Sequence, residues 1–277
     1  MKLLTWDLPL MQPEGDGRED DKAASVTAYL LDWGQEEEKK RPAVIICPGG
    51  GYWRHSPREG EPIAMEYLAM GCHAFILQYT VRPGSFPEGL LELALLVAQI
   101  RERSQEWKVD SDKIVVSGFS AGGHLACSLG VFWNREFVYG PIGRKAEEIR
   151  PDGMILCYPV ITSGIYCHEG SFKNLLGDQA ANHEKRRLVS LEKQAGPHTP
   201  KVFMWHTFTD ETVPVQNALL FADALVKNGV NLEFHLFPSG GHGLSLARED
   251  TGNGQENLVE PRCQCWINLA GEWIKNL

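Results

Sequence analysis

From residue 43 onward, short apolar segments alternate with helical patterns, and this alternation restricts the possible folds more than any other feature of the chain. The apolar segments are rich in β-branched side chains and lack the polar–apolar alternation of a half-exposed strand. Apolar strands separated by helices are typical of a parallel sheet that is buried on both faces. We therefore predict an α/β fold with a mostly parallel central sheet and helices on both faces.

The chain has 277 residues, which is a normal length for one large α/β domain, and we predict a single domain over residues 1–277. The predicted strands are 43–47, 73–79, 114–117, 154–158, 201–207 and 232–237, with an edge strand at 26–31. The predicted helices are 59–69, 87–107, 121–132, 214–228 and 261–275. Segments 13–22 and 34–42 are polar and are predicted to be loops. Segment 159–200 is long, polar and irregular, so we expect a partial lid or a substrate wall there.

A serine lies between glycines where the predicted strand 114–117 gives way to the predicted helix 121–132, in the sequence Gly-Phe-Ser-Ala-Gly-Gly. A nucleophile on a sharp strand-to-helix turn needs small neighbours, and the helix N-terminus places free N–H groups beside it. Ser120 is therefore the predicted nucleophile. The alternative is a glycine-rich turn that contains a serine by chance.

The sequence Pro-Gly-Gly-Gly-Tyr at 48–52 follows an earlier predicted strand. Acyl transfer needs hydrogen-bond donors that point at the developing oxyanion, and glycines let backbone N–H groups come close to it. We assign this oxyanion hole to the N–H of Gly50 or Gly51 together with that of Ala121. An ordinary glycine loop is the alternative.

Two later strand ends carry the remaining candidates. Asp210 follows the predicted strand 201–207, and His242 lies among glycines after the last predicted strand. The chain order Ser, Asp, His is the order expected when a nucleophile elbow works with a histidine base. Glu211 is a possible substitute for Asp210, and both acidic residues could instead favour the start of the helix that begins at Pro214.

The other histidines have weaker claims to a catalytic role. His124 lies one turn after Ser120 on the predicted helix, and His206 lies inside a predicted strand. Both are expected to be packing residues. Of the nine histidines, His242 alone occupies the expected place in the chain order.

At these residues the chain resembles the carboxylesterases of the α/β-hydrolase fold, in particular the bacterial group of acetyl-xylan-esterase-like enzymes. The resemblance runs from about residue 43 to the end and rests on PGGGY at 48–52, GFSAGGHLA at 118–126, DETVP at 210–214 and FPSGGHG at 237–243. Hormone-sensitive-lipase-like esterases have a histidine where this chain has Pro48, so that group fits less well.

The resemblance implies a serine hydrolase that cleaves small acyl esters, including acetylated sugars, through an acyl-enzyme and without a cofactor. Tyr52 and Trp53, just beyond the oxyanion loop, could stack on a sugar ring or an acyl group, or could be packing residues. A peptidase of the same fold and a catalytically silent binding protein remain as alternatives. A peptidase usually needs an additional large domain, and a silent protein usually lacks one member of the triad.

The composition of the chain limits the kinds of partner and the cellular setting that we expect. The formal net charge of −9 disfavours nucleic acids and anionic membranes, and no apolar run approaches the ~18 residues of a membrane span. Asp7 and Pro9 interrupt the N-terminal apolar stretch, so no signal peptide is expected. The seven cysteines include three in apolar segments, which favours buried free thiols, and their spacing does not suit zinc. We expect a cytoplasmic enzyme without metal, and the oligomeric state stays open, a homodimer being one option.

Overall fold

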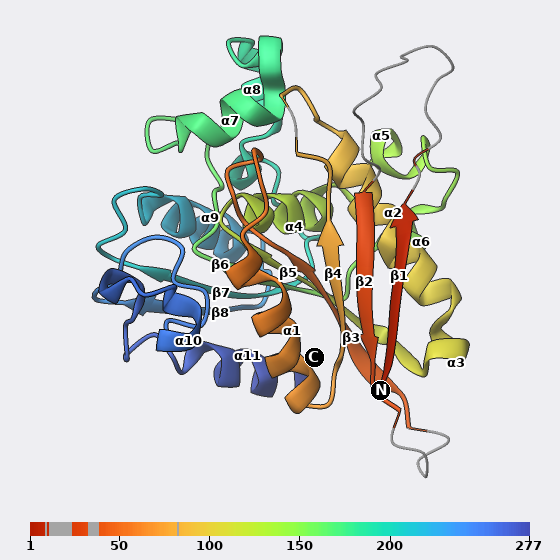
Figure 1. Cartoon of the computed structure of the whole chain (residues 1–277). Coiled ribbons are helices and arrows are strands. Elements are labelled where there is room, and N and C mark those ends of the chain that lie inside the picture. The colour runs from red at the N-terminus through yellow and green to blue at the C-terminus, as the bar shows by residue number, and fades with distance from the viewer. Residues whose placement is uncertain (9, 11–23, 33–38, 82) are drawn as a thin grey trace.

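The computed structural model describes residues 1–8, 10, 24–32, 39–81 and 83–277. These residues contain eight strands in a single sheet of order β1-β2-β4-β3-β5-β6-β7-β8 (Figure 1). The strands are β1 Lys2–Leu8, β2 Ala24–Leu30, β3 Arg41–Cys47, β4 His73–Gln78, β5 Val109–Phe119, β6 Gly153–Cys157, β7 Lys201–Thr207 and β8 Leu232–Phe237. β1 and β2 pair antiparallel, as do β2 and β4, whereas all pairs from β4 to β8 are parallel. The predicted α/β class with a mostly parallel sheet is confirmed.

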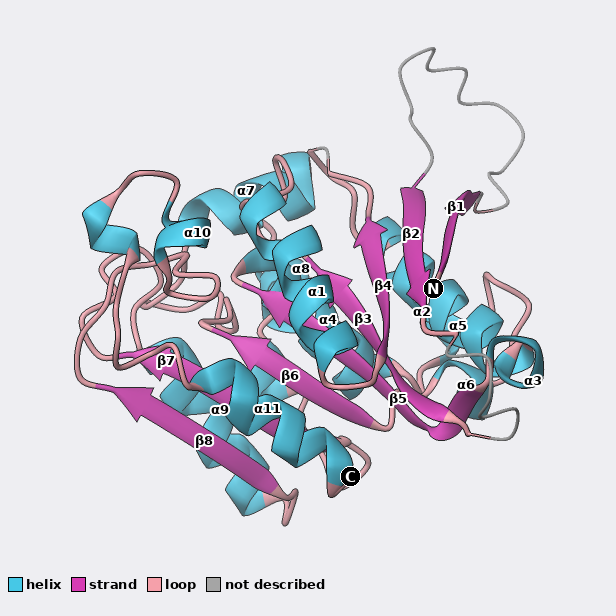
Figure 2. Cartoon of the chain, turned by 60° about the horizontal axis from the view of Figure 1, so that its bottom comes forward, coloured by secondary structure: helices cyan, strands magenta, loops and turns pink. Residues whose placement is uncertain are grey.

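Helices cover both faces of the sheet (Figure 2). The α-helices are α1 Glu61–Ala69, α2 Glu88–Glu102, α3 Ser104–Trp107, α4 Ala121–Phe132, α5 Glu136–Tyr139, α6 Ala146–Ile149, α7 Glu169–Leu176, α8 His183–Leu188, α9 Gln216–Lys227, α10 Glu249–Gly252 and α11 Trp266–Lys275. Alternate residues of each central strand point to opposite faces: Ile46 joins the core under α1 and α11, and Ile45 joins the core under α2, α4 and α9. The central strands are apolar on both sides because both sides are covered, whereas the edge strands β1 and β8 are only partly buried.

The antiparallel end of the sheet differs from the prediction. The segment predicted at 26–31 as an edge strand is β2, which lies between β1 and β4, so it is not an edge. The edge is β1, a strand that was not predicted from the sequence. Its buried or half-buried positions are Leu4, Trp6 and Leu8, so the strand has the period of two that a half-covered edge requires.

The ends of several helices and strands also differ from the prediction. The predicted helix 87–107 is two helices, α2 and α3, because the backbone leaves helical geometry at Arg103 with ψ of 15°. This turn lets the Trp107 ring pack against Trp6 and Phe75, each at a centroid distance of 5.6 Å. The predicted loop 34–42 ends earlier than expected, since Arg41 already belongs to β3. Residues 34–38 and the predicted loop 13–22 lie outside the described residues.

Segment 159–200 contains α7, α8 and two short 3₁₀ turns, so it has more regular structure than the sequence suggested. Asn217 of α9 anchors the start of this segment, because the Asn217 Oδ1 accepts the N–H of Ile161 and of Thr162. Asn174 of α7 donates to the carbonyl of Gly51 at 2.8 Å, so α7 rests on the glycine loop that follows β3. No helix among the described residues has the length and hydropathy that a membrane span needs.

Candidate active site

Ser120 occupies the sharp turn between β5 and α4, with φ 53° and ψ −116°. A positive φ is strained for a residue with a Cβ, and such strain is typical of a nucleophile elbow. Two glycines make the turn possible. A Cβ on Gly118 would lie 2.1 Å from the carbonyl oxygen of Gly122, and a Cβ on Gly122 would lie 2.0 Å from that of Cys47.

Gly122→Ala is therefore expected to lower stability by about 1–3 kcal/mol or more, because the clashing atoms belong to the backbone and cannot swing away. Gly89→Ala is the matched control. Gly89 lies in α2, where an added Cβ would meet its nearest neighbour at 3.6 Å, and alanine favours a helix over glycine. Thermal unfolding of both variants tests the prediction, which fails if Gly122→Ala melts at the temperature of the unmodified protein.

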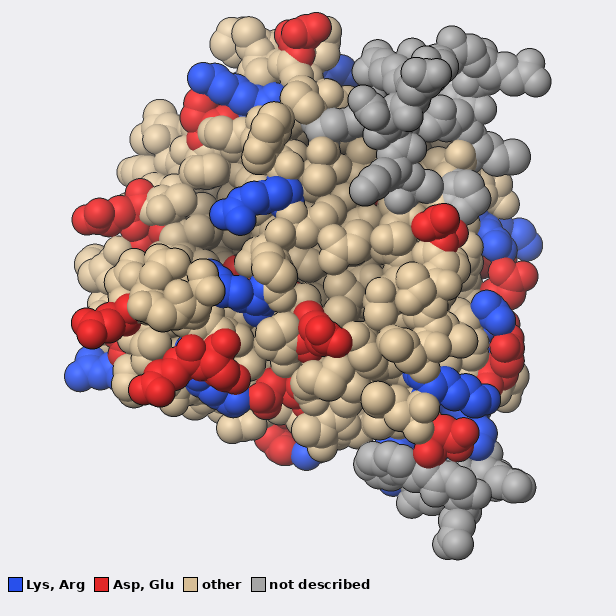
Figure 3. Space-filling view, viewed as in Figure 1, with Lys and Arg blue, Asp and Glu red and all other residues tan. Residues whose placement is uncertain are grey.

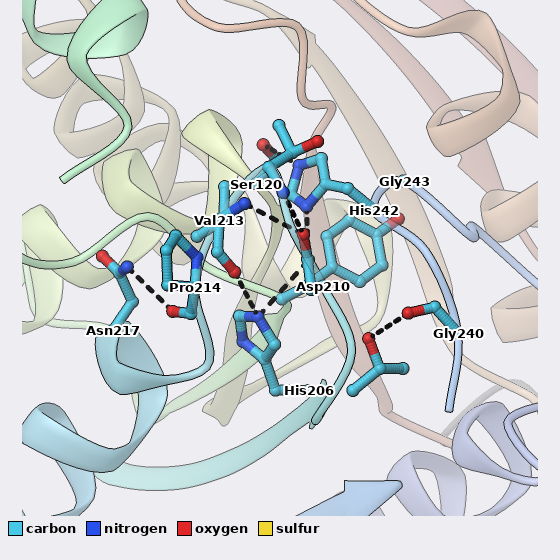
Figure 4. Close-up of polar contacts among 12 residues, drawn as sticks. Ser120, His206, Asp210, Val213, Pro214, Asn217, Gly240, His242 and Gly243 are labelled. Carbon is cyan, nitrogen blue, oxygen red and sulfur yellow. Dashed lines mark hydrogen bonds and ion pairs between the residues drawn. The ribbon is translucent and has the colours of Figure 1, made fainter. Parts of the chain in front are cut away.

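The three residues predicted from strand ends meet in one hydrogen-bonded chain (Figure 4). His242 Nε2 lies 2.7 Å from Ser120 Oγ, and His242 Nδ1 lies 2.7 Å from Asp210 Oδ2. Asp210 comes from the loop after β7 and His242 from the loop after β8, so parallel strands bring distant parts of the chain to one end of the sheet. The arrangement can pass a proton from the serine hydroxyl to the imidazole.

Asp210 is buried, and both of its carboxylate oxygens are occupied. Oδ1 accepts the N–H of Thr212 and of Val213, each at 2.9 Å, while Oδ2 faces His242. Burial alone would raise the pKa of Asp210, but the hydrogen bonds from His206 and His242 outweigh it and hold this pKa well below its usual range. Glu211 is exposed and forms no hydrogen bond with His242 in the described part of the chain.

His206 is fully buried in β7, as a packing residue would be, yet it also reaches the carboxylate. Its Nε2 lies 2.9 Å from the Val213 carbonyl and 3.4 Å from Asp210 Oδ2. Two acceptors face this nitrogen, so it carries the proton, and His206 supplies a second donor to Asp210 beside His242. The signal in the sequence is its spacing of four residues before Asp210 at the end of a strand, which alone does not distinguish it from a core histidine.

The glycine loop after β3 lies against the elbow. The backbone N–H groups of Gly50, Gly51 and Ala121 donate no hydrogen bond to any described residue. Gly50 and Gly51 have φ values of 134° and 67°, which a residue with a side chain would rarely adopt. A Cβ on Gly50 would also lie 2.0 Å from the carbonyl oxygen of Arg54. The loop therefore depends on its glycines and leaves its donors unoccupied.

Of the two aromatic candidates, Tyr52 is a packing residue. Its side chain is buried, and its hydroxyl lies 2.8 Å from Nδ1 of His124, which the sequence had also assigned to packing. Burial lowers the pKa of His124 to about 4, so this imidazole is a neutral member of the core. Trp53 is 64% exposed and remains free to contact a ligand.

Some residues around the site had no signal in the sequence. Glu59 is buried beneath the glycine loop, and Tyr158 packs edge-to-face against the His242 ring with centroids 5.1 Å apart. Among the described residues no cluster of three or more His, Cys, Asp or Glu side chains could hold a metal ion. All seven cysteines are free thiols, and the three in apolar segments are buried as predicted: Cys47, Cys127 and Cys157.

Comparison with known proteins gives relatives for this fold and site. The family model described as BD-FAE matches residues 31–225. The chain is 38% identical over 231 residues to endo-1,4-beta-xylanase B of Butyrivibrio fibrisolvens, covering 82% of this chain and 35% of that protein. It is 25% identical over 261 residues to an acetylxylan esterase of Xylanibacter ruminicola, covering 88% of this chain and 50% of that protein. The chain thus spans about a third to a half of the length of these curated relatives.

Solved structures match over nearly the whole chain. An acetyl ester-xyloside bifunctional hydrolase from Caldicellulosiruptor lactoaceticus superposes with a TM-score of 0.81 at 35% identity, covering 98% of this chain and 96% of that one. The carboxylesterase Cest-2923 from Lactobacillus plantarum WCFS1 superposes with a TM-score of 0.85 at 28% identity, covering 100% and 98%. The chain therefore belongs to the BD-FAE family, has the α/β-hydrolase fold, and is related to carboxylic ester hydrolases of the acetyl-xylan-esterase-like group.

Proposed function

We propose that the chain is a serine carboxylic ester hydrolase in which Ser120 is the nucleophile, His242 the general base and Asp210 the residue that orients the base. The observation that carries this proposal is the hydrogen-bonded chain itself, with two successive contacts of 2.7 Å. Nucleophile, base and orienting acid within hydrogen-bond reach are what acyl transfer through a covalent intermediate requires.

In this mechanism Ser120 Oγ attacks the ester carbonyl while His242 Nε2 takes its proton. Asp210 holds the tautomer with the proton on Nδ1 and stabilises the imidazolium. The oxyanion is bound by the N–H of Gly50 or Gly51 together with that of Ala121, and their lack of other acceptors supports this role. His242 then protonates the leaving alcohol, and water repeats the cycle on the acyl-enzyme.

Short acyl esters, with acetylated sugars among them, are the proposed substrates. Relatives named as an acetylxylan esterase and as an acetyl ester-xyloside hydrolase support this choice. Segment 159–200 is proposed to form a wall of the site, since Asn174 fastens α7 to the loop of Gly51. Burial lowers the pKa of His168 at the start of α7. The charge of His242 lowers this pKa as well, whereas the charge of Asp210 raises it. Exposed Trp53 is proposed to stack on a sugar ring.

Acetyl esters are expected to be hydrolysed with a higher kcat/KM than longer esters. Burial of each methylene of an acyl chain contributes about 0.8 kcal/mol of binding free energy. The polar wall offers little apolar surface on which a longer acyl chain could gain this free energy. The measurement is kcat/KM for p-nitrophenyl acetate, butyrate and octanoate, together with acetylated xylose. A steady rise toward the octanoate would identify a lipase-type site instead.

The two alternative functions make different predictions for one reagent. A fluorophosphonate probe reacts covalently with an activated serine, so a catalytically silent binding protein would stay unlabelled. A peptidase of the same fold would be labelled but would cleave peptide amides as well as esters. We expect labelling at Ser120 and no turnover of peptide p-nitroanilides.

The surface charge bears on which partners we propose. On the described part of the face in Figure 3, acidic and basic side chains are interspersed, and the formal net charge of the chain is −9. This distribution does not favour nucleic acids or anionic membranes as partners. Seven free thiols support the proposal of a reducing, cytoplasmic setting, and a homodimer remains one option for the assembly.

A further inference from the structure

Glu59 is a buried carboxylate that lies between two loops of the site. Its side chain is only 3% exposed. Oε2 accepts the N–H of Gly49 at 2.9 Å, and Oε1 accepts the hydroxyl of Tyr158 at 2.6 Å. No described basic side chain forms an ion pair with it. Burying a carboxylate without a cation is costly, so these hydrogen bonds are needed to keep Glu59 in place.

On one side, Glu59 fixes the glycine loop. Gly49 directly precedes Gly50, and it is held at both ends, because its N–H donates to Glu59 and its carbonyl accepts the N–H of Ser56 at 2.8 Å. The contact is close: a Cβ on Gly49 would lie 2.8 Å from Glu59 Oε2 and 3.0 Å from the Cβ of Ser120. The position of the following N–H groups relative to Ser120 thus depends on this carboxylate.

On the other side, Glu59 contacts the loop that carries His242 through Tyr158. The Tyr158 hydroxyl that donates to Glu59 also accepts the N–H of Ser245 at 2.9 Å, three residues beyond His242. The Tyr158 ring packs edge-to-face on the His242 ring. The neighbouring Arg58 donates to the carbonyl of Gly243 at 2.6 Å. The short turn at 58–59 therefore contacts the loops on both sides of the nucleophile.

We propose that Glu59 is a positioning residue that holds the Gly49–Gly51 loop and, through Tyr158, the His242 loop in register with Ser120. This inference rests on the proposed esterase function. Donors stabilise an oxyanion only when they lie at hydrogen-bond distance from the position that the oxyanion takes in the transition state. A carboxylate that fixes the loop before substrate binds removes the need to reorganise it during the reaction.

The test compares Glu59→Ala, Glu59→Gln and Glu59→Asp in p-nitrophenyl acetate hydrolysis. Glu59→Ala is expected to lower kcat about 10²-fold with KM changed less than about threefold, since removal of one oxyanion donor costs 10²–10³ in kcat. Glu59→Gln is expected to lose less than about tenfold, because its amide oxygen still accepts from Gly49. Glu59→Asp keeps the charge but is one methylene shorter and cannot reach both partners, so it should be less active than Glu59→Gln.

Tyr158→Phe separates the effect on the glycine loop from the effect on the His242 loop. It keeps the hydrogen bond between Gly49 and Glu59 and removes the hydroxyl that accepts the N–H of Ser245. It is expected to retain more activity than Glu59→Ala. The binding constant of a phenylboronic acid, which forms a tetrahedral adduct on an activated serine, should weaken in parallel with kcat/KM across the series. A protein that is merely less stable would show an altered melting temperature without this parallel change.

The inference is overturned if folded Glu59→Ala turns over at the wild-type rate, or if the boronic acid binds it unchanged. If Glu59→Ala does not fold, Glu59→Asp replaces it, and a folded aspartate variant with the wild-type kcat and unchanged boronic acid binding also overturns the inference. Failure of the esterase proposal is distinguishable, because the unmodified protein would then not hydrolyse p-nitrophenyl acetate, or Ser120→Ala would hydrolyse it at the same rate.

Discussion

Ser120→Ala is expected to lower the hydrolysis of p-nitrophenyl acetate by about 10⁴-fold or more, the largest effect of any substitution in this chain. The hydroxyl is the only atom at the elbow that can form the acyl-enzyme, and the alanine variant keeps just the oxyanion donors and substrate binding. The fold should persist, since the elbow is built by Gly118 and Gly122 rather than by the serine side chain.

Ser128→Ala provides the matched control for this experiment. Ser128 is a buried serine within α4, and its hydroxyl donates to the carbonyl of His124 at 2.8 Å and not to His242. Its removal should cost about 1 kcal/mol of stability and leave kcat unchanged. Fluorophosphonate labelling should disappear in Ser120→Ala and persist in Ser128→Ala. Turnover near the wild-type rate by a folded Ser120→Ala protein would end the assignment.

The parts of the site that were predictable from sequence are those with a local signal. Ser120, Asp210 and His242 each follow the end of a strand, and parallel strands bring such positions to the same end of the sheet. The glycines at 118 and 122 signal a turn that no larger residue fits. Strand, turn and helix are short-range properties, so a single sequence can reveal them.

The parts that were not predictable depend on contacts between distant segments. Glu59 contacts Tyr158, which lies 99 residues further along the chain, and nothing in the sequence around either residue indicates that contact. The role of Tyr52 was left open between packing and substrate contact for the same reason, since the sequence does not show that its hydroxyl contacts the buried His124, 72 residues further along the chain. β1 gives only a weak signal because it is an edge strand: Leu4, Trp6 and Leu8 are buried or half-buried, but the exposed Leu3 breaks the alternation of apolar and polar residues.

Asp210→Asn is expected to lower kcat about 10⁴-fold, as in a comparable triad, while Glu211→Gln leaves kcat nearly unchanged. In Asp210→Asn, the amide oxygen can replace Oδ1, which accepts the N–H of Thr212 and of Val213. The amide NH₂ group must then face His242 Nδ1 and donate to it. That places the imidazole proton on Nε2, so the ring can no longer accept the proton of the nucleophile.

The two variants differ in what else they disturb. In Asp210→Asn the NH₂ group also faces the N–H of His206, so two donors oppose each other in a buried site and some stability is lost as well. Glu211 is exposed and lies outside the first turn of α9, which begins at Gln216 rather than at the predicted Pro214, so its substitution is expected to change stability little. Substrate binding does not use the Asp210 carboxylate, so KM should change little in either variant while kcat separates them. Steady-state kinetics on both proteins, with circular dichroism to confirm folding, tests this prediction. If Glu211→Gln lost most of its activity while Asp210→Asn kept it, the acid of the triad would be misassigned.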